Sequence, residues 1–533
     1  MDTKALRQKI LDLAIRGKLV PQDPNDEPAS VLLERIREQK KQMVKDGKLK
    51  AKDIKNDTII FVGEDNLYYE KFQDGTVKCI EDEIPFEVPK GWEWCRLGTL
   101  FSTVTGSTPS TKDPSLYGDE YPFYKPTDLD AGFDVHFSED TVSEKGYKSG
   151  RILPEYSVLV TCIGATIGKT GYIRNSGICN QQINAILPNA SILPEYTYFC
   201  MCSEFEQRQI WTNSSATTLP ILNKSKFDSL LFPVPPKAQQ TRTVERINKL
   251  LHFVEIIQQE KITLQETIEL TKSKILDLAI RGKLVPQDPN DEPASVLLER
   301  IRAEKEELLK QGKIKRDNKE SIIFRGDDNS YYEKIDDEMR CIDKEIPFEI
   351  PDTWEWLRLE NCCCKEIRRG KSPKYIEQSE TLVFAQKCNT KYNGIDIGLA
   401  LYLDESTLNK YPEDEYMQDG DIVINSTGTG TLGRVGFYRA TDNRNSIPIV
   451  PDSHVTVIRS YRELHAFYLY AFMKANQSEL EKKGEGSTNQ KELKPLTLKE
   501  LYVPIPPYEE QLRIAVSINN AFSLISKLEK SLK

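Results

Sequence analysis

The sequence predicts an α+β fold: two α/β globular domains separated by long antiparallel coiled-coil helices, arranged as a pseudo-two-fold cyclic repeat. Three observations support this prediction. The stretch KILDLAIRGKLVPQDPNDEPASVLLERIR occurs twice without a change, at residues 9–37 and 274–302. Each copy is followed by a region of short strand-like runs. A run without proline or glycine extends from 237 to about 280, with apolar residues near a heptad seam.

Each copy of the repeat predicts two helices joined by a defined connection. Residues 4–16 form the first helix, because apolar residues recur at helical spacing and Gly17 is a typical helix end. The connection at 19–28 contains three prolines. Pro28 then opens a second amphipathic helix that ends at Gly47.

A second pair of matching stretches follows the repeat. TIIFVGEDNLYYEK at 58–71 matches SIIFRGDDNSYYEK at 321–334, and EIPFEVPKGWEWCRL at 83–97 matches EIPFEIPDTWEWLRL at 345–359. Alternating apolar and polar residues predict short strands here. Packing at a domain entrance is favoured over base stacking for the paired tryptophans, Trp92 and Trp94 and their counterparts Trp354 and Trp356.

The two globular regions diverge in sequence but keep one pattern. SVLVTCIGATIGKTGYI at 157–173 and DIVINSTGTGTLGRVGFY at 421–438 both read as a strand followed by a Gly/Thr-rich loop. Both regions end in a polar loop and a proline-rich exit, at 217–236 and 487–507. We therefore expect one fold to be used twice with different surfaces.

The C-terminal stretch at 509–522 resembles 238–251, where the central helix begins. Joined end to end, the C-terminal and N-terminal helices rebuild a near-copy of the central helix. Because an apolar seam must be buried, we expect the central helix to pack antiparallel against this composite helix. The predicted segments are 1–57 (helices and linker), 58–235 (first domain with entrance strands), 236–320 (central helix and second repeat copy), 321–506 (second domain with entrance strands) and 507–533 (C-terminal helix pairing with the central helix).

Composition restricts the class of protein. The net charge of −9 argues against binding nucleic acid through bulk positive charge, although it leaves local basic grooves possible. The eleven cysteines lack paired C-x-x-C spacing, and three are consecutive at 362–364, so we expect reduced thiols rather than disulfides or zinc ligands. No apolar run is long enough for a membrane span and none resembles a signal peptide, which predicts a cytoplasmic protein without a membrane partner.

Two short motifs resemble catalytic sites but lack a required residue. IGATIGKT at 163–170 resembles a phosphate-binding P-loop, yet Ile163 stands where glycine is needed. IPPY at 505–508 resembles an amino-methyltransferase motif, yet Ile505 replaces the Asn or Asp that holds the target amine. We predict no catalytic residues and no metal ligands in this chain.

The duplicated stretch, the paired entrances PFEVPKGWEW and PFEIPDTWEW, the CIGATIGKTGYI loop and the proline-rich exits into long helices together resemble the specificity subunit of a type I restriction–modification system. The resemblance covers essentially the whole chain. It implies two target-recognition domains, each reading one half of an asymmetric bipartite target in double-stranded DNA.

The resemblance also implies partners. The conserved helices would bind two modification methyltransferase subunits, and restriction (nuclease/translocase) subunits would complete the nuclease. The chain itself would use no cofactor, because S-adenosylmethionine, ATP and Mg belong to the partner subunits. The charged rows on the helices after Pro28 and Pro293 are then either solvated faces or methyltransferase contacts. The alternative function is a two-headed scaffold that binds protein without recognising DNA.

The Gly/Thr-rich loops and their polar neighbours are the best candidates for reading DNA. Glycine lets backbone approach phosphate closely, while Thr, Lys, Arg, Gln and Asn donate to phosphates and base edges. For each candidate the alternative is a turn or capping residue. The candidates are Lys125, Thr127, Thr166, Lys169, Gln181, Gln182, Asn223 and Lys224 in the first domain, and Lys387, Asn389, Thr429, Thr431, Arg434, His454, Asn489 and Lys491 in the second.

Overall fold

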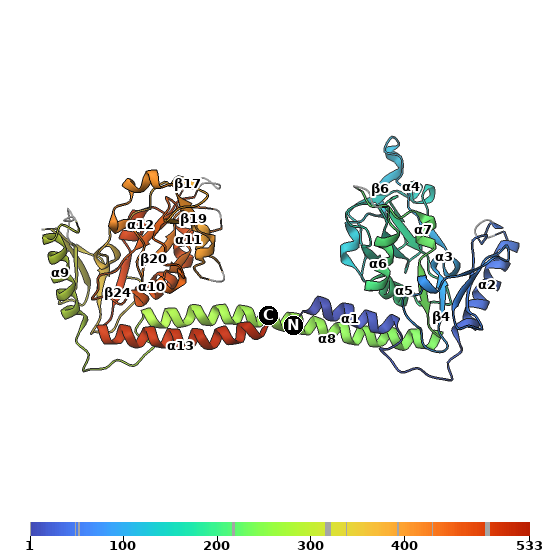
Figure 1. Cartoon of the computed structure of the whole chain (residues 1–533), viewed down its shortest axis with the longest axis horizontal. Helices are drawn as coiled ribbons and strands as arrows, with labels where there is room; N and C mark the ends of the chain where they lie inside the picture. Colours follow the sequence, from blue (N-terminus) through green and yellow to red (C-terminus); the bar gives the residue numbers. More distant parts are fainter. Residues whose placement is uncertain are drawn as a thin grey trace. The chain divides into compact units, whose positions relative to one another are not determined.

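The computed structural model describes residues 2–532 except 48, 52–53, 216–218, 315–320, 337, 392–393, 429 and 486–490. The chain divides into two compact units, Met1–Lys261 and Ile262–Lys533. Both units mix helices with short strands, which confirms the predicted α+β class (Figure 1). The five segments expected from the sequence are a finer division and stay a prediction.

Among the residues that the structure describes, the first unit contains seven α-helices and the beginning of a longer one. The helices are α1 (Thr3–Ile15), α2 (Ala29–Lys45), α3 (Leu97–Leu100), α4 (Glu144–Ser149), α5 (Pro194–Met201), α6 (Glu204–Asn213), α7 (Lys224–Asp228) and α8 (Lys237–Ile280). The strands are β1 (Ile59–Val62), β2 (Tyr68–Lys71), β3 (Val77–Cys79), β4 (Glu93–Arg96), β5 (Thr103–Thr105), β6 (Tyr117–Tyr124), β7 (Thr141–Val142), β8 (Val158–Thr161), β9 (Thr170–Tyr172), β10 (Ile178–Cys179), β11 (Ile183–Ile186) and β12 (Leu231–Val234). They form sheets in the orders β1-β2-β3, β10-β6-β7, β5-β11-β8-β9 and β12-β4.

The second unit begins within α8 and has a similar arrangement, although corresponding sheets differ in their number of strands. Its other helices are α9 (Ala294–Lys310), α10 (Ala466–Ala475), α11 (Gln477–Lys482), α12 (Pro495–Lys499) and α13 (Tyr508–Leu532). Its strands are β13 (Ser321–Arg325), β14 (Tyr331–Ile335), β15 (Glu338–Cys341), β16 (Glu355–Arg358), β17 (Tyr375–Ile376), β18 (Leu382–Phe384), β19 (Leu401–Leu403), β20 (Ile422–Asn425), β21 (Val435–Phe437), β22 (Ile449–Pro451), β23 (Val455–Ile458) and β24 (Tyr502–Ile505). The sheet orders are β13-β14-β15, β17-β19-β18-β22, β21-β20-β23 and β16-β24.

Both helices predicted for the first repeat copy are present, with ends within two residues of the expected ones. Gly17 follows α1 with a φ of +64°, a conformation that favours glycine. A Cβ at Gly17 would also lie 2.5 Å from Cγ of Pro89, and Gly282 has the same φ > 0 and the same 2.5 Å approach to Pro351. The repeat therefore ends its first helix directly against the domain entrance.

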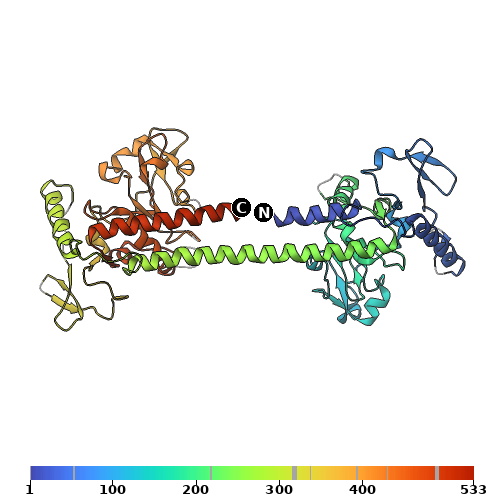
Figure 2. The ribbon, with the colours of Figure 1, turned by 90° about the horizontal axis from the view of Figure 1, so that it is seen from below.

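The long helix is antiparallel to a terminal helix in each unit (Figure 2). In the first unit Arg7 of α1 forms an ion pair with Glu255 of α8 at 3.6 Å. In the second unit Glu529, near the end of α13, pairs with Lys272 of α8 at 2.7 Å. The predicted continuous helix from 237 to 280 is confirmed.

The apolar seam of α8 is buried only in part. Val254 and Ile268 are buried, whereas Ile257 and Leu264 are 38% and 41% exposed. The expectation that the whole seam is covered is wrong at these two positions. Both positions lie between the ion pairs that join α8 to its covering helices, Arg7 with Glu255 in the first unit and Glu529 with Lys272 in the second.

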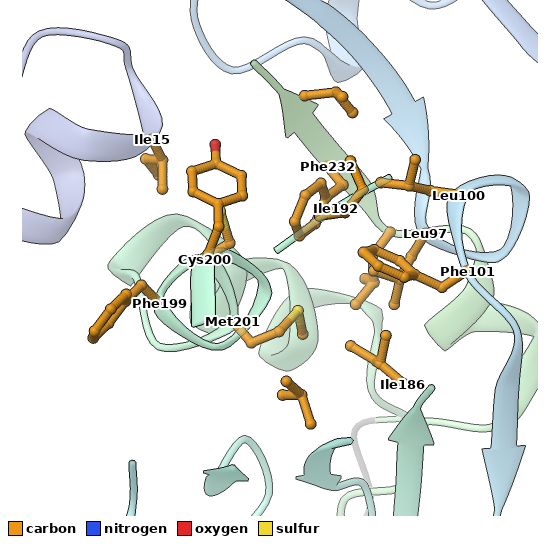
Figure 3. Packing of buried hydrophobic residues seen from close by; sticks show 14 of the residues in the cluster. Ile15, Leu97, Leu100, Phe101, Ile186, Ile192, Phe199, Cys200, Met201 and Phe232 are labelled. Carbon is orange, nitrogen blue, oxygen red and sulfur yellow. The ribbon is translucent and has the colours of Figure 1, made fainter. Parts of the chain in front are cut away.

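One apolar cluster joins the repeat to the globular domain in the first unit. Ile15 of α1 belongs to one cluster with side chains of α3, α5, β11 and β12, and Figure 3 shows residues of this cluster. In the second unit Ile280 and Leu297 join an equivalent cluster with Leu359 and Met473. Because the repeat supplies part of each core, its two helices are fixed to the domains that they precede.

The entrance tryptophans are core residues. Trp94 and Trp356 are fully buried. The indole Nε1 of Trp92 donates to Gln22 of the repeat and to Gln239 of α8, at 3.0 and 3.1 Å. The prediction that these rings pack at a domain entrance is confirmed.

Candidate nucleic-acid interface

Each unit presents a β-hairpin whose loop is rich in glycine and threonine. In the first unit, loop 162–169 joins the antiparallel strands β8 and β9. In the second, loop 426–434 joins β20 and β21. The predicted pattern of a strand followed by such a loop is confirmed in both.

Corresponding hydrogen bonds close the two hairpins. The amide of Gly168 donates to the carbonyl of Thr161 at 2.8 Å, and the amide of Gly433 donates to that of Asn425 at 2.8 Å. Both glycines have φ > 0, at +87° and +75°. The residues that follow these glycines in the two units, Lys169 and Arg434, therefore occupy equivalent positions.

In the first unit, three other predicted segments lie beside the hairpin loop. The amide of Cys162 donates to the carbonyl of Gln182 at 2.7 Å, and that of Gly164 donates to Pro220 at 3.0 Å. The amide of Asn180 donates to the carbonyl of Tyr124, which precedes Lys125. The structure thus brings candidates from four separate stretches of sequence to one surface.

The second unit repeats these contacts with different residues. The amide of Ser426 donates to the carbonyl of His454, and that of Leu493 donates to Ser426, both at 2.8 Å. The amide of Asp452 donates to the carbonyl of Phe384 at 3.0 Å. His454 therefore corresponds to Gln182, and Asp452 to Asn180.

The cationic candidates of the first unit are paired with acidic residues of the same unit. Lys169 lies 2.7 Å from Asp130, and Lys125 forms an ion pair with Asp140. Lys224 bonds to Asp228 at 2.5 Å. Each of the three lysines is therefore held by a carboxylate of its own unit.

The uncharged candidates of the first unit fall into two groups. The side chain of Asn223 caps α7 by accepting the amide of Lys226 at 3.0 Å, which is the capping alternative. The carbonyl of the Gln182 side chain accepts from Asn180 at 2.9 Å. The others are exposed, namely Thr127, Thr166 and Gln181.

Two candidates of the second unit hold the hairpin loop in place. Asn389 is buried and donates to the side-chain carbonyl of Asn425 at 3.2 Å and to the carbonyl of Arg434 at 3.0 Å. The guanidinium of Arg434 donates back to the carbonyl of Asn389 at 2.8 Å and to that of Gly430 at 3.0 Å. Asn389 is therefore internal, whereas Arg434 combines loop support with a partly exposed position.

The remaining candidates of the second unit differ in exposure. The hydroxyl of Thr431 donates to the carbonyl of Thr427 at 3.1 Å. Nδ1 of His454 lies 2.7 Å from the hydroxyl of the same Thr427. Lys387, His454 and Lys491 are exposed, and two candidates lie outside the described residues, namely Thr429 and Asn489.

A glycine near the start of each domain was missed by the sequence reasoning. Gly106 and Gly370 open the related stretches GSTPS and GKSPK. Each donates its amide to the strand beside the hairpin, to Ile183 and Val455 respectively, at 2.9 Å. A Cβ would lie 2.0 Å from the carbonyl oxygen of Asn180 at the first position. The recurring G-x-[ST]-P pattern was the signal that could have revealed them.

A helix also braces each hairpin, which no sequence pattern indicated. The side-chain amide of Gln207 in α6 donates to the carbonyl of Gly168 at 2.8 Å. In the second unit a Cβ at Gly433 would lie 2.7 Å from the backbone nitrogen of Glu481 in α11. The bracing helices limit how far the loops can move.

The cysteines and the topology at the hairpin of the first unit differ from those of a reactive thiol site and of a P-loop. Burial raises the pKa of the Cys162 and Cys179 thiols to about 12, so both stay protonated near neutral pH. Residues 163–170 connect two antiparallel strands, whereas a P-loop connects a strand to a helix. Burial also raises the pKa of Asp452, while the corresponding Asn180 of the first unit does not titrate.

Comparison with known proteins identifies the family. The sequence model described as "Type I restriction modification DNA specificity domain" matches residues 89–266 and 351–533, more than half of the chain.

No helix formed by residues that the structure describes has the length and apolar character of a membrane span.

Similar proteins agree with this assignment. The type I restriction enzyme EcoEI specificity subunit of Escherichia coli is 27% identical, over 99% of this chain and 91% of its own length. The EcoAI specificity subunit of Escherichia coli is 29% identical, over 67% of this chain and 62% of its own length.

The fold has a relative among solved structures. A chain from the structure described as "Structural basis underlying complex assembly and conformational transition of the type I R-M system" aligns with a TM-score of 0.58 and 17% identity, covering 84% of this chain and 94% of that one. With two specificity domains in one chain, DNA recognition holds over the protein-scaffold alternative, and the protein belongs to the type I restriction–modification DNA specificity family.

Proposed function

We propose that each unit reads one half of an asymmetric bipartite target in double-stranded DNA through the surface around its hairpin loop. The observation that carries this proposal is a shared backbone frame with different side chains. Lys169 is replaced by Arg434, and Gln182 by His454, at positions with equivalent backbone hydrogen bonds. Because base edges are read by side chains, the same frame can address two different sequences.

Two identical docking sites for methyltransferase subunits are the second part of the proposal. The repeat copies have the same sequence and the same attachment, since Ala29 donates to Gly91 at 2.8 Å and Ala294 donates to Thr353 at 2.9 Å. The connections 21–25 and 286–290 are exposed in both units. Two copies of one partner need two equivalent surfaces, which explains why this part of the chain is the same twice.

The chemistry then belongs to partner subunits. Methyltransferase subunits would use S-adenosylmethionine, and restriction subunits would use ATP and Mg, while this chain supplies the choice of DNA sequence. The acidic net charge of −9 fits such a division, because most of the non-specific phosphate attraction can come from the partners. The complex would act where the DNA is, in the cytoplasm.

Mapping of methylated bases tests the DNA part. The full-length chain is co-expressed with its methyltransferase in a host without other DNA methylation, and modified positions are sequenced. We expect one asymmetric target of two short parts separated by a fixed spacer. Methylation without a sequence preference, or at a palindrome, would contradict the proposal.

Charge introduced into the exposed connections tests the docking part. Pro24 and Pro289 are exposed prolines at the same place in the two copies. We expect Pro24→Arg or Pro289→Arg to leave one bound methyltransferase where the unaltered chain holds two, and the double variant to hold none, measured by native mass spectrometry. Glu377→Arg, an exposed position outside the repeat, serves as the control. Two bound subunits on the double variant would place the docking site elsewhere.

A further inference from the structure

The hairpin surface of the first unit carries exposed apolar side chains. Trp211 of α6 is 52% exposed, Ile221 is 39% exposed and Leu219 is 51% exposed. Single exposed apolar residues need no explanation, but Ile221 bridges both Ile163 of the hairpin loop and Ser215, which lies two residues after α6. A Cβ at Gly164 of that loop would lie 3.9 Å from Cδ1 of Leu219.

The helix α6 places Trp211 next to the hairpin. The side chain of Gln207 fixes α6 to Gly168, the last glycine of the loop. Trp211 follows Gln207 by four residues and therefore lies one turn further along the same face of the helix. The indole remains half exposed although the helix beneath it is fixed.

The backbone around Ile221 directs its side chain outward. Ile221 forms an antiparallel bridge with Ile163 of the hairpin loop. The next residue, Leu222, is buried and donates its amide to Cys162 at 2.8 Å. Successive side chains of an extended segment point to opposite sides, so Ile221 faces away from the core.

The second unit has a charged residue at the corresponding place. Glu492 forms the bridge with Thr427 that Ile221 forms with Ile163, and Leu493 donates to Ser426 as Leu222 donates to Cys162. The carboxylate of Glu492 pairs with Arg369 at 2.8 Å. The two reading surfaces therefore differ in kind at this point, apolar in one unit and ionic in the other.

Charges near the apolar residues favour DNA over protein as the occupant. Lys226 donates to the carbonyl of Asn213 at 2.9 Å, next to the end of α6, and the part of the chain that the structure describes gives it no ion pair. Lys224 follows Ile221 by three residues and Lys169 ends the hairpin loop, and each faces a carboxylate that phosphate can replace. A cationic border around an apolar centre is complementary to a DNA groove.

We propose that Ile221 and Trp211 read the 5-methyl group of thymine in the half-site recognised by the first unit. This inference rests on the proposed reading of DNA by the hairpin surfaces. The thymine methyl is the apolar group that base edges present in the major groove, so apolar side chains can recognise it by contact. The second unit, with Glu492 and Arg369 at that place, reads its half-site by hydrogen bonds instead.

Replacement of thymine by uracil tests the inference directly, because it removes one methyl group and no hydrogen-bonding atom. The duplexes carry the target sequence found by mapping methylated bases. In each duplex one thymine is replaced by deoxyuridine. Equilibrium binding is measured with the full-length chain bound to its methyltransferase subunits. We expect the replacement of at least one thymine in the first half-site to lower the affinity for the duplex about fourfold. This is the ratio that corresponds to ~0.8 kcal/mol for one buried methyl group. Replacement of thymine by uracil in the second half-site should leave the affinity for the duplex unchanged.

Variants then assign the effect to the named side chains. Ile221→Ala should bind the thymine and uracil duplexes equally, and Trp211→Ala should reduce the difference, whereas Ile221→Leu should restore it. Leu496→Ala is the matched control, because Leu496 is an exposed apolar residue on the reading domain of the second unit. It should leave the fourfold difference in the first half-site unchanged.

Three results would overturn the inference while leaving bipartite DNA recognition intact. One is a first half-site without thymine on either strand. Another is equal binding of thymine and uracil duplexes by the unaltered chain, with Ile221→Ala weaker on every sequence, which would mean contact with the DNA backbone. The third is unchanged DNA binding by both alanine variants with loss of methyltransferase, which would mean a protein interface. Absence of any bipartite specificity would instead contradict the proposed function itself.

Discussion

Arg242, at the start of α8, donates to both carboxylate oxygens of Asp26 in the connection of the repeat. Arg513, at the start of α13, makes the same two contacts with Asp291. Both aspartates are nearly buried. The junction between repeat and long helix is therefore built twice from the same parts.

Removal of one charge from this junction should destabilise its own unit. We expect Asp26→Asn to lower the free energy of unfolding of the first unit by about 1–2 kcal/mol, and Asp291→Asn to do the same in the second. The arginine side chains are 37% and 35% exposed, and solvent screening keeps the effect at this modest size. Hydrogen exchange resolved by peptide measures each unit separately, and clearly unequal losses would show that the two junctions are not equivalent.

The glycine at the start of each reading domain should not tolerate a side chain. Gly106→Ala places a Cβ 2.0 Å from the carbonyl oxygen of Asn180, so the turn that carries Gln181 and Gln182 must shift. We expect a loss of about 1–3 kcal/mol in stability and weaker binding of the first half-site, measured by unfolding and by gel shift. Ser107→Ala is the control at the next position. Wild-type affinity in Gly106→Ala would exclude this turn from the interface.

Asp130 should weaken DNA binding by holding Lys169. The carboxylate is 74% exposed and lies 2.7 Å from the lysine nitrogen. We expect Asp130→Asn to raise affinity and to steepen the salt dependence by about one counterion, because the freed lysine can pair with a phosphate. The double variant Asp130→Asn with Lys169→Ala should lose the gain. An unchanged salt slope would mean that Lys169 lies outside the DNA path.

The equivalent residues Lys169 and Arg434 should respond differently to truncation. If each reads a guanine, Lys169→Ala and Arg434→Ala weaken binding by about 1–3 kcal/mol and relax specificity at one base pair. Arg434→Ala also removes donors to the carbonyls of Asn389 and Gly430, so its loop becomes less ordered. Gel shifts with a panel of targets separate these effects, and unchanged preference in both variants would refute base reading by this position.

The two entrances should differ in their response to pH. Glu510 accepts from Trp354 at 2.9 Å, where the first unit has Gln239 against Trp92. Burial raises the pKa of Glu510 above its ordinary 4.5, although the hydrogen bonds from Trp354 and Gln287 oppose the shift. The folded state thus binds the proton more tightly than the unfolded state, so this stabilisation is present below pH 4.5 and is lost as pH rises through the folded pKa.

Replacement of the Glu510 carboxyl should therefore remove this difference in pH dependence between the two units. We expect Glu510→Gln to raise the unfolding free energy of the second unit at pH 8 more than at pH 5, measured by denaturant titration at both values. Gln239→Glu should make the first unit pH-sensitive in the same direction. A second unit with the same pH dependence before and after Glu510→Gln would show that other groups control it.

Helix boundaries and internal symmetry were predictable because their signals are local or exact. The absence of proline and glycine after Lys237 predicted α8 to its observed ends, and the repeated stretch predicted both helices of each copy. The Gly/Thr-rich loops were also located correctly, since each follows an apolar strand. The roles of individual side chains in these loops were less predictable.

The sequence by itself determined the two-fold repeat, the long helix and the family, because identity and periodicity are properties of the chain alone. Only the tertiary structure decided which side chains of the two domains face outward. Asn389 is buried and Asn223 caps a helix, whereas Trp211 and Ile221 are exposed beside a hairpin from a distant stretch. Such outcomes depend on contacts between segments far apart in the chain, and the periodicity of one segment carries no information about the other.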